Sequence, residues 1–141
     1  MRRSINGLNL VSKHNMTETE VQKQIITWCG YALKSNVVYW STPNEREPKR
    51  MGALRAMGLK TGVSDLIFLR DGYAIFVEVK RPTTYKWNDK RTKKIIDQRG
   101  GTLSTAQEEF KNAVTAAGFT FYMVNNLPDF QNIMGRWGWV K

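Results

Sequence analysis

The segment 62–82 constrains the fold of this chain most, because it predicts a β-hairpin with charged residues at its open end. Two apolar runs flank the dipeptide Asp71-Gly72, which is a strong signal for a two-residue hairpin turn. A turn of this length pairs the strands so that Asp65 is expected to face Glu78 directly. Like charges that face each other across two strands are destabilising, so this pair needs an explanation.

The two strands of this hairpin are apolar on both faces, which is typical of strands in the interior of a sheet. Lys80 lies two residues beyond Glu78, and since side chains alternate along a strand, both project from the same face. Unpaired charge is costly in such surroundings. The apolar residues are Leu66, Ile67, Phe68, Leu69, Ala74, Ile75, Phe76, Val77 and Val79.

A divalent cation bound between Asp65 and Glu78 would resolve the conflict between the two acids. The alternative is a salt bridge at the sheet end, in which Lys80 neutralises one acid and the other points into water. A single pairing leaves the second carboxylate without a partner, so we favour the metal site. A β-bulge would change which residues face each other. The pattern by itself does not define a reaction.

The bulk composition describes one globular domain with an anionic partner. A chain of 141 residues with 41% hydrophobic residues can build its own core and is not a disordered protein. The net charge of +10 and the pI near 10 predict a nucleic acid as the simplest partner. Cys29 is the single cysteine and cannot form an internal disulfide, which fits a reducing cytoplasm. No run approaches the roughly 20 apolar residues of a membrane span.

The spacing of apolar and turn residues predicts the order α, β, α, β-hairpin, α, β, α, without internal repeats. Residues 1–16 show little periodicity and are expected to form a flexible N-terminal extension, followed by one domain over 17–141. Two helix starts match the capping box, in which Ser or Thr is followed three residues later by Glu or Gln. The expected helices cover 17–34, the region of 54–57, 104–117 and 127–134, and the expected outer strands cover 37–41 and 119–124.

Several other residues are assigned to the core. Cys29 shares an apolar helix face with Trp28 and is expected to be inert. Trp137 and Trp139 either pack the C-terminal segment against the core or join a dimer surface, and we favour core packing. Methionines are flexible enough to fill irregular gaps, which is the role expected of Met51, Met57 and Met123.

Residues 81–103 form a polar insertion, in which seven basic side chains outnumber two acidic ones and for which we expect weak local structure. A mobile, solvated loop is the plain explanation of such a charge run. Tyr85 and Trp87 interleave with the lysines, however, and this pattern suits phosphate contacts combined with base stacking. We therefore favour DNA contact. The expected DNA-binding residues are Lys86, Trp87, Lys90, Arg91, Lys93 and Lys94, with Asn44, Lys49 and Arg50 from an upstream polar stretch.

Four motifs occur in the order that is found in the PD-(D/E)xK nuclease superfamily. They are Glu20, Gly62-x-x-Asp65, Glu78-x-Lys80 and Ser104-x-x-Gln107. From about Met16 to the C-terminus the chain resembles the virus-type replication-repair nuclease domain, VRR-NUC. The resemblance implies a restriction-endonuclease-like α/β domain, with a central mixed sheet flanked by helices. The chain departs from the pattern at Ser64, where many members have proline, and in the length of the insertion.

The resemblance implies a metal-dependent, structure-selective endonuclease that hydrolyses phosphodiester bonds in DNA with Mg²⁺ or Mn²⁺. Asp65, Glu78 and the backbone carbonyl of Val79 would be the metal ligands. Lys80 would orient water or phosphate and stabilise the developing charge.

Glu20 and Gln107 each have two explanations. The capping box alone accounts for both residues, whereas the resemblance makes Gln107 a site residue and lets Glu20 reach the metal through water. Either residue can do both jobs only if its side chain need not fold back onto the helix start.

Small stand-alone members of this family resemble Holliday-junction resolvases, which act as homodimers. We therefore expect branched DNA, a four-way junction in particular, as the partner of a symmetric dimer. The expected location is the cytoplasm of a bacterial or phage-infected cell. Two alternatives stay open: a flap or nicking nuclease with the same site, and a non-enzymatic DNA-binding module in which the two acids are structural.

Overall fold

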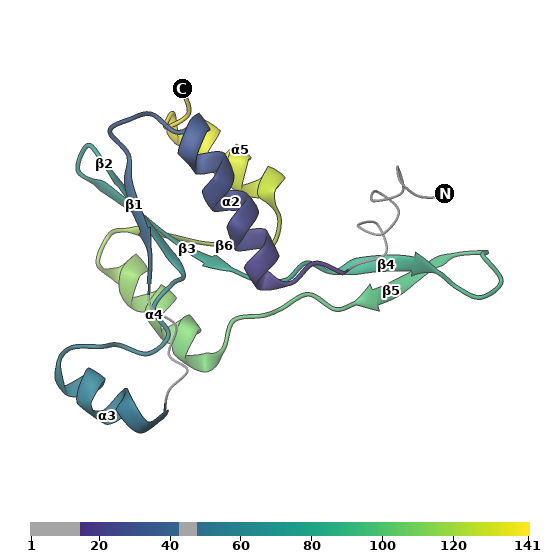
Figure 1. Cartoon of the computed structure of the whole chain (residues 1–141), viewed down its shortest axis with the longest axis horizontal. Helices are drawn as coiled ribbons and strands as arrows, with labels where there is room; N and C mark the ends of the chain where they lie inside the picture. The colour runs from purple at the N-terminus through teal and green to yellow at the C-terminus, as the bar shows by residue number, and fades with distance from the viewer. Residues whose placement is uncertain (1–14, 43–47) are drawn as a thin grey trace.

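The computed structural model describes residues 15–42 and 48–141 and shows a four-stranded sheet with helices on both faces (Figure 1). The strand order is β1-β2-β3-β6, with antiparallel pairing from β1 to β3 and parallel pairing between β3 and β6. The predicted α/β domain with a mixed sheet is therefore confirmed. The strands are β1 (Val38–Ser41), β2 (Leu66–Arg70), β3 (Tyr73–Val79) and β6 (Thr120–Val124).

The β2–β3 hairpin has the register that its turn predicts. Asp71 and Gly72 both have positive φ, 50° and 82°, as a two-residue turn of the mirror-image type requires. Arg70 is paired with Tyr73, and the pairing continues without a bulge to Leu66 and Val77. Both strands lie in the interior of the sheet, in agreement with their apolar character on both faces.

One face of the sheet is covered by α2 (Glu18–Ala32) and α5 (Leu127–Trp137), which lie side by side in Figure 1. The capping box of Thr17 and Glu20 is formed at the start of α2. The helices and strands share one apolar core, and burying each such side chain contributes about 1.5–3 kcal/mol. The core includes Val21, Ile25, Cys29, Phe130, Ile133 and Met134 from the helices, and Leu66, Phe68, Ile75, Val77, Val79 and Val124 from the strands.

The Cys29 side chain is buried in this core. Burial raises the pKa of its thiol to about 12, so the thiol stays protonated at neutral pH. Since the thiolate is the reactive form of cysteine, this residue is inert, as predicted.

The opposite face of the sheet carries α4 (Thr105–Ala116), which connects the parallel strands β3 and β6. The ring of Phe110 packs edge-on against Phe76 and Phe121 at centroid distances of 5.8 and 6.4 Å. Ser104 caps the helix, and Gly118 with a φ of 93° follows its end. A further helix, α3 (Pro48–Ala56), lies between β1 and β2 in the chain.

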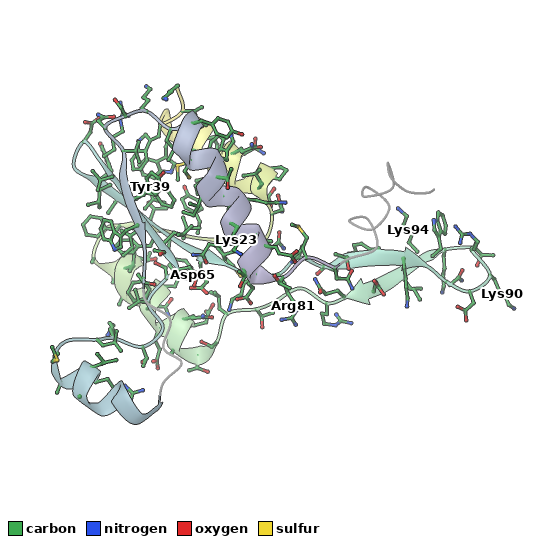
Figure 2. The ribbon with its side chains drawn as sticks, in the orientation of Figure 1. Lys23, Tyr39, Asp65, Arg81, Lys90 and Lys94 are labelled. Atoms are coloured by element: carbon green, nitrogen blue, oxygen red, sulfur yellow. The ribbon has the colours of Figure 1, made fainter. Side chains whose placement is uncertain are left out.

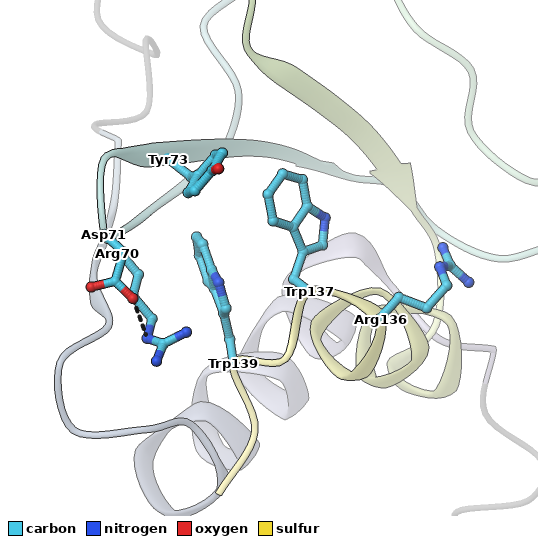
Figure 3. Close-up of a pocket in the computed structure, with 6 residues that line it drawn as sticks. All are labelled: Arg70, Asp71, Tyr73, Arg136, Trp137 and Trp139. Atoms are coloured by element: carbon cyan, nitrogen blue, oxygen red, sulfur yellow. Dashed lines mark ion pairs between the residues drawn. The ribbon is translucent and has the colours of Figure 1, made fainter.

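The C-terminal tryptophans pack as predicted. Trp139 is buried, and its ring lies 5.6 Å from that of Trp137, which in turn contacts Tyr73 (Figure 3). Trp137 also donates a hydrogen bond to the hydroxyl of Tyr122. The rings of Tyr73, Trp137 and Trp139, with Arg70, Asp71 and Arg136, line a surface cavity of about 400 Å³ at the turn end of the hairpin.

The predicted role of two methionines is wrong. Met57 and Met123 are 84% and 45% exposed, so neither fills a gap in the core. Met57 follows the last residue of α3, and Met123 lies on β6, which is an edge strand. The side chain of Met51, the third methionine of this prediction, lies outside the part of the structure that is described.

Residues 81–103 also differ from the prediction, because they contain a second β-hairpin rather than weak local structure. The strands β4 (Thr84–Trp87) and β5 (Lys94–Gln98) pair in antiparallel fashion and project away from the domain as a narrow arm (Figure 1). We call residues 84–98 the arm. Its turn is closed by Asn88, whose side chain accepts the N–H of Thr92 and whose own N–H donates to the Lys93 carbonyl.

The base of the arm is joined to the domain by several hydrogen bonds. The Gln98 amide donates to the carbonyls of Met16 and Pro82, and the Thr84 hydroxyl bonds the side chain of Asn15. Asn15 and Met16 belong to the expected N-terminal extension, whose residues 1–14 lie outside the described part of the chain. The chain segment that enters α2 is thus attached to the arm.

None of the helices in the part of the chain that the structure describes is long and apolar enough to cross a membrane.

Gly62 sets the distance between the chain before β2 and the start of α4. Its φ is +79°, and a Cβ at this position would lie within about 2.5 Å of the Ala106 carbonyl carbon. We expect Gly62→Ala to lower the free energy of unfolding by at least about 1–3 kcal/mol, because the left-handed conformation and the clash both oppose the methyl group. Urea unfolding of the purified chain measures this loss.

Gly30→Ala is the control for this substitution. Gly30 lies inside α2, and a Cβ added to it would meet no other atom within 4 Å, so alanine should gain about 0.5–1 kcal/mol. Equal stability of the two variants would show that α4 can move away from Gly62.

Candidate active site

The open end of the β2–β3 hairpin brings Asp65 and Glu78 together. Asp65 precedes β2 by one residue, and its backbone carbonyl accepts a hydrogen bond from the N–H of Thr42, 2.9 Å away, at the end of β1. Its side-chain Oδ2 accepts the N–H of Val79, next to Glu78, at 2.8 Å. The Asp65 carboxylate is therefore held across the strand pair beside the Glu78 carboxyl group, where the register predicts it.

Glu78 is the most deeply buried charged side chain among the described residues, with 2% of its surface exposed. Its Oε2 accepts a hydrogen bond of 3.0 Å from the Gln107 amide and lies 3.7 Å from the ammonium of Lys80. Its Oε1 is also buried, but no donor among the described residues lies within hydrogen-bonding distance of it. An orphaned buried carboxyl oxygen is costly, so this atom marks a place for a cation or a proton.

The surroundings of Glu78 favour its neutral form in the metal-free protein. Burial first, and then the neighbouring Asp65 carboxylate, raise the pKa of Glu78 to about 8, against the opposing effect of Lys80. The negative charge of Glu18 acts in the same direction as Asp65. Perturbed carboxyl groups of this kind are common in functional sites.

Lys80 is largely buried, with 8% of its surface exposed, and continues the sheet beyond β3. Its N–H donates to the Val124 carbonyl of β6, and its Nζ donates to Gln107 Oε1 at 2.8 Å. Gly101, where the chain returns from the arm, lies against its aliphatic part, since a Cβ there would be 3.1 Å from Lys80 Cδ. The ammonium is thus fixed beside Glu78.

Gln107 both caps α4 and joins the site. Its Oε1 accepts the N–H of Ser104 at 2.9 Å as well as the Lys80 ammonium, while its Nε2 donates to Glu78. The expectation that a side chain folded back onto the helix start cannot also serve the site is therefore wrong for Gln107. The amide oxygen has two lone pairs and the amide nitrogen two N–H donors, so a single orientation satisfies the helix start and both charged residues.

Two glutamates at the start of α2 differ in their contacts. The Glu20 carboxylate accepts the N–H of Thr17 at 2.8 Å, which forms the predicted capping box, and its role in the site stays a prediction. Glu18, which sequence reasoning missed, lies close enough to Glu78 to affect its ionisation, and its Oε2 is 3.5 Å from a Cβ placed on Gly101. Acidic residues are ordinary in a first helical turn, so no local pattern singles out Glu18.

The predicted DNA-binding residues fall into two groups. Six lie on the arm and are exposed, away from the two acids; Figure 2 shows Lys90 at the tip and Lys94 on β5, far from Asp65. They are Lys86, Trp87, Lys90, Arg91, Lys93 and Lys94. Of the upstream group, Lys49 and Arg50 belong to α3, and Asn44 lies outside the described residues.

The oxygen atoms of the site suit a hard divalent cation. Among the described residues, no group of three or more His, Cys, Asp or Glu side chains is arranged to hold a metal ion. The carboxylates of Asp65 and Glu78 nevertheless lie together, and one Glu78 oxygen has no donor within the described part of the chain. Mg²⁺ is commonly held by one or two carboxylates and several waters, so two acids are sufficient for it.

The fold is similar to that of a solved structure. A chain described as a VRR_NUC domain protein superposes with a TM-score of 0.61 over 87% of this chain and 88% of that chain, at 17% sequence identity. No protein-family model and no curated protein matches the sequence. The chain has a mixed α/β fold that is VRR-NUC-like, as the four motifs predict.

The raised pKa of Glu78 predicts a pH-dependent stability of the metal-free protein. The unfolded chain loses this proton near the ordinary value of 4.5 and the folded chain only near 8. Between these values the folded state binds more protons, so the free energy of unfolding should fall as the pH rises. Glu78→Gln should remove this fall and be more stable than the wild type at pH of about 8, because its amide can donate to Asp65. Urea unfolding in EDTA at several pH values measures both effects.

Glu109→Gln is the control, since Glu109 is an exposed acid on α4. A fall in stability that is equally steep in wild type and Glu78→Gln would place the titrating group elsewhere.

Proposed function

We propose that this protein is a metal-dependent endonuclease that hydrolyses phosphodiester bonds in DNA. The observation that carries the proposal is the buried Glu78 carboxyl group beside Asp65, with one oxygen lacking a donor among the described residues and Lys80 fixed next to the other. Likeness to a VRR_NUC domain protein and the net charge of +10 also support a nuclease that acts on a polyanion.

Mg²⁺ or Mn²⁺ would be held by the carboxylates of Asp65 and Glu78, with the backbone carbonyl of Val79 as a third oxygen ligand. Such an ion, when bound, supplies charge neutralisation at the phosphate and lowers the pKa of a water molecule. The protein contributes the fixed positions of the two acids: Asp65 is held by the N–H of Val79, and Glu78 by the amide of Gln107.

Lys80 would act on the phosphate or on the attacking water. Its ammonium is held between Gln107 Oε1 and Glu78 Oε2, so its position is fixed before the substrate arrives. Electrostatic stabilisation by groups fixed in advance around a developing charge is usually the largest single contribution to catalysis. Gln107 is then a positioning residue, because it orients both Glu78 and Lys80. Glu20 could order a water molecule at the site, and Glu18 adds negative charge on the same side.

For the substrate, we propose branched DNA, with a homodimer that makes paired cuts across a four-way junction. Two identical sites related by a two-fold axis suit the two-fold symmetry of such a junction. The second candidate is a flap or nicking nuclease with the same site. The exposed aromatic residues of the arm favour it, because unpaired bases can stack on them.

Cleavage assays on labelled DNA test the proposed function. The panel is a four-way junction, a flap, a linear duplex and a single strand, each with Mg²⁺, Mn²⁺ or EDTA. We expect metal-dependent cleavage by the wild type and a rate about 100- to 1,000-fold lower for Lys80→Ala, because a fixed charge at the phosphate is lost. Metal binding should be nearly unchanged in this variant, which calorimetry can measure.

Asp65→Ala is the companion variant and should abolish cleavage while DNA affinity holds or rises. Full activity of Lys80→Ala would remove its catalytic role. Binding of all substrates without cleavage in any metal would instead favour a DNA-binding module in which the two acids are structural.

The double role of Gln107 is tested by comparison with Ser104. Gln107→Ala and Ser104→Ala each remove half of the capping box. Ser104→Ala should cost about 0.5–2 kcal/mol of stability, and Gln107→Ala should cost more, because it also unpairs the buried Glu78 and Lys80. Only Gln107 contacts Glu78 and Lys80. We therefore expect Gln107→Ala to lower the cleavage rate by at least about tenfold more than Ser104→Ala, under conditions in which both variants are folded. Equal cleavage rates of the two variants would show that Gln107 acts only as a helix cap.

A further inference from the structure

The arm presents two different faces. In an antiparallel pair, opposed residues project to the same side, and the pairs are Tyr85 with Ile96, Lys86 with Ile95, and Trp87 with Lys94. Tyr85, Trp87, Ile96 and Lys94 therefore share one side, which we call the aromatic face of the arm. The Lys94 ammonium lies 5.7 Å from the centre of the Trp87 ring, as expected for residues on one side.

The aromatic face is exposed along its whole length. Tyr85, Trp87 and Ile96 are 61%, 47% and 41% exposed, although aromatic and branched side chains usually bury most of their surface. The other face has no aromatic side chain: it carries the ion pair of Lys86 with Asp97, at 3.3 Å, and Ile95, which is 36% exposed. The exposed aromatic side chains of the arm are thus gathered on the side opposite to this ion pair, together with the ammonium of Lys94.

We propose that the aromatic face of the arm binds unpaired nucleotides of the DNA substrate. Bases stack on Tyr85 and Trp87, while Lys94 and the basic residues of the turn, Lys90, Arg91 and Lys93, contact the phosphates. This inference rests on the proposed function, from which it takes DNA as the ligand. It favours a flap, or branched DNA that carries a single-stranded segment, over a fully paired four-way junction.

The charge of the arm favours a nucleic acid over a protein. Segment 81–103 has seven basic and two acidic side chains, and the whole chain carries a net charge of +10. If two copies of this chain associated through their arms, two positively charged segments would face each other. Electrostatic repulsion opposes such a contact. Interleaved aromatic and basic side chains are the usual combination for single-stranded nucleic acids, in which each base offers a π-face and each phosphate a charge.

The nature of the exposed residues favours unpaired over paired DNA. A two-stranded ribbon can enter the major groove of a duplex, but it meets only base edges there, which polar side chains read by hydrogen bonds. The faces of paired bases are covered by their neighbours in the stack. Tyr85, Trp87 and Ile96 offer flat or apolar surfaces, which match the faces of unstacked bases.

The arm also has the right position for this role. It leaves the sheet four residues after Lys80, and the chain returns at Gly101, which lies against the Lys80 side chain. A DNA strand bound along the arm would therefore run toward the two acids.

Binding in EDTA tests this inference separately from catalysis. Fluorescence anisotropy with the full chain compares a labelled single-stranded oligonucleotide with a duplex of the same sequence. Wild type should bind the single strand more tightly. Trp87→Leu should weaken that binding about 10- to 100-fold, whereas Trp87→Phe should stay within a few-fold, because phenylalanine keeps a ring for stacking.

Two further variants control for charge and for folding of the arm. Lys94→Ala should weaken single-strand binding more than Lys86→Ala, since both remove one positive charge but only Lys94 lies on the aromatic face. Ile95→Ala disturbs the hairpin on the other face and should leave binding unchanged. A loss with Ile95→Ala as large as with Trp87→Leu would show that affinity follows arm folding, and would overturn the inference.

Other outcomes also decide the question. Equal affinity for single strand and duplex, or no effect of Trp87→Leu, would overturn it, even if the enzyme cleaves DNA. A change of sedimentation coefficient with Trp87→Leu at unchanged DNA affinity would assign the aromatic face to contact between copies of the chain. Arm-dependent binding of single strands in a protein that never cleaves DNA would support the inference and reject the proposed function.

Discussion

The repulsion between two carboxyl groups that share one end of a buried strand pair is the constraint on which the site depends. The Asp71-Gly72 turn fixes the register, and the register places Asp65 against Glu78. Separating them would require a one-residue slip, which would move every core side chain of the hairpin to the opposite face of the sheet. The apolar core on one face of the sheet thus fixes the register that keeps Asp65 and Glu78 close together on the other face.

The neighbouring elements compensate only part of the cost of placing these two carboxyl groups together. The start of α4 supplies Gln107, whose amide contacts one oxygen of Glu78 and the ammonium of Lys80, and Gly62 allows the helix to approach closely enough for this. The second Glu78 oxygen receives no donor from the described residues. An apolar residue in place of such an acid would give a more stable fold, since buried charge without full pairing destabilises the folded state. The conflict is therefore best explained by function.

Sequence reasoning succeeded where a local rule has a long reach. A two-residue turn determined the pairing of a whole hairpin, and the capping boxes of Thr17 and Ser104 marked helix starts to within a residue. It failed for segments that have no buried face, and for contacts that depend on tertiary packing. The arm has no face in the core, and the alternation of Tyr85, Lys86 and Trp87 spans only three residues, too few to be recognised as a strand against a run of lysines. Glu18 was missed because its place in the site depends on how α2 packs over the sheet, which no local pattern encodes.

The hydrogen bonds at the base of the arm also bear on where DNA would be cut. Gln98 and Thr84 tie both strands of the arm to the residues that enter α2, so the arm has a fixed direction relative to the site. Trp87 lies seven residues beyond Lys80, a span of at most about 25 Å. A strand held at one end of this span and cleaved at the other would be cut at a constant number of nucleotides from the held segment, whatever its sequence. The arm would then work as a molecular ruler.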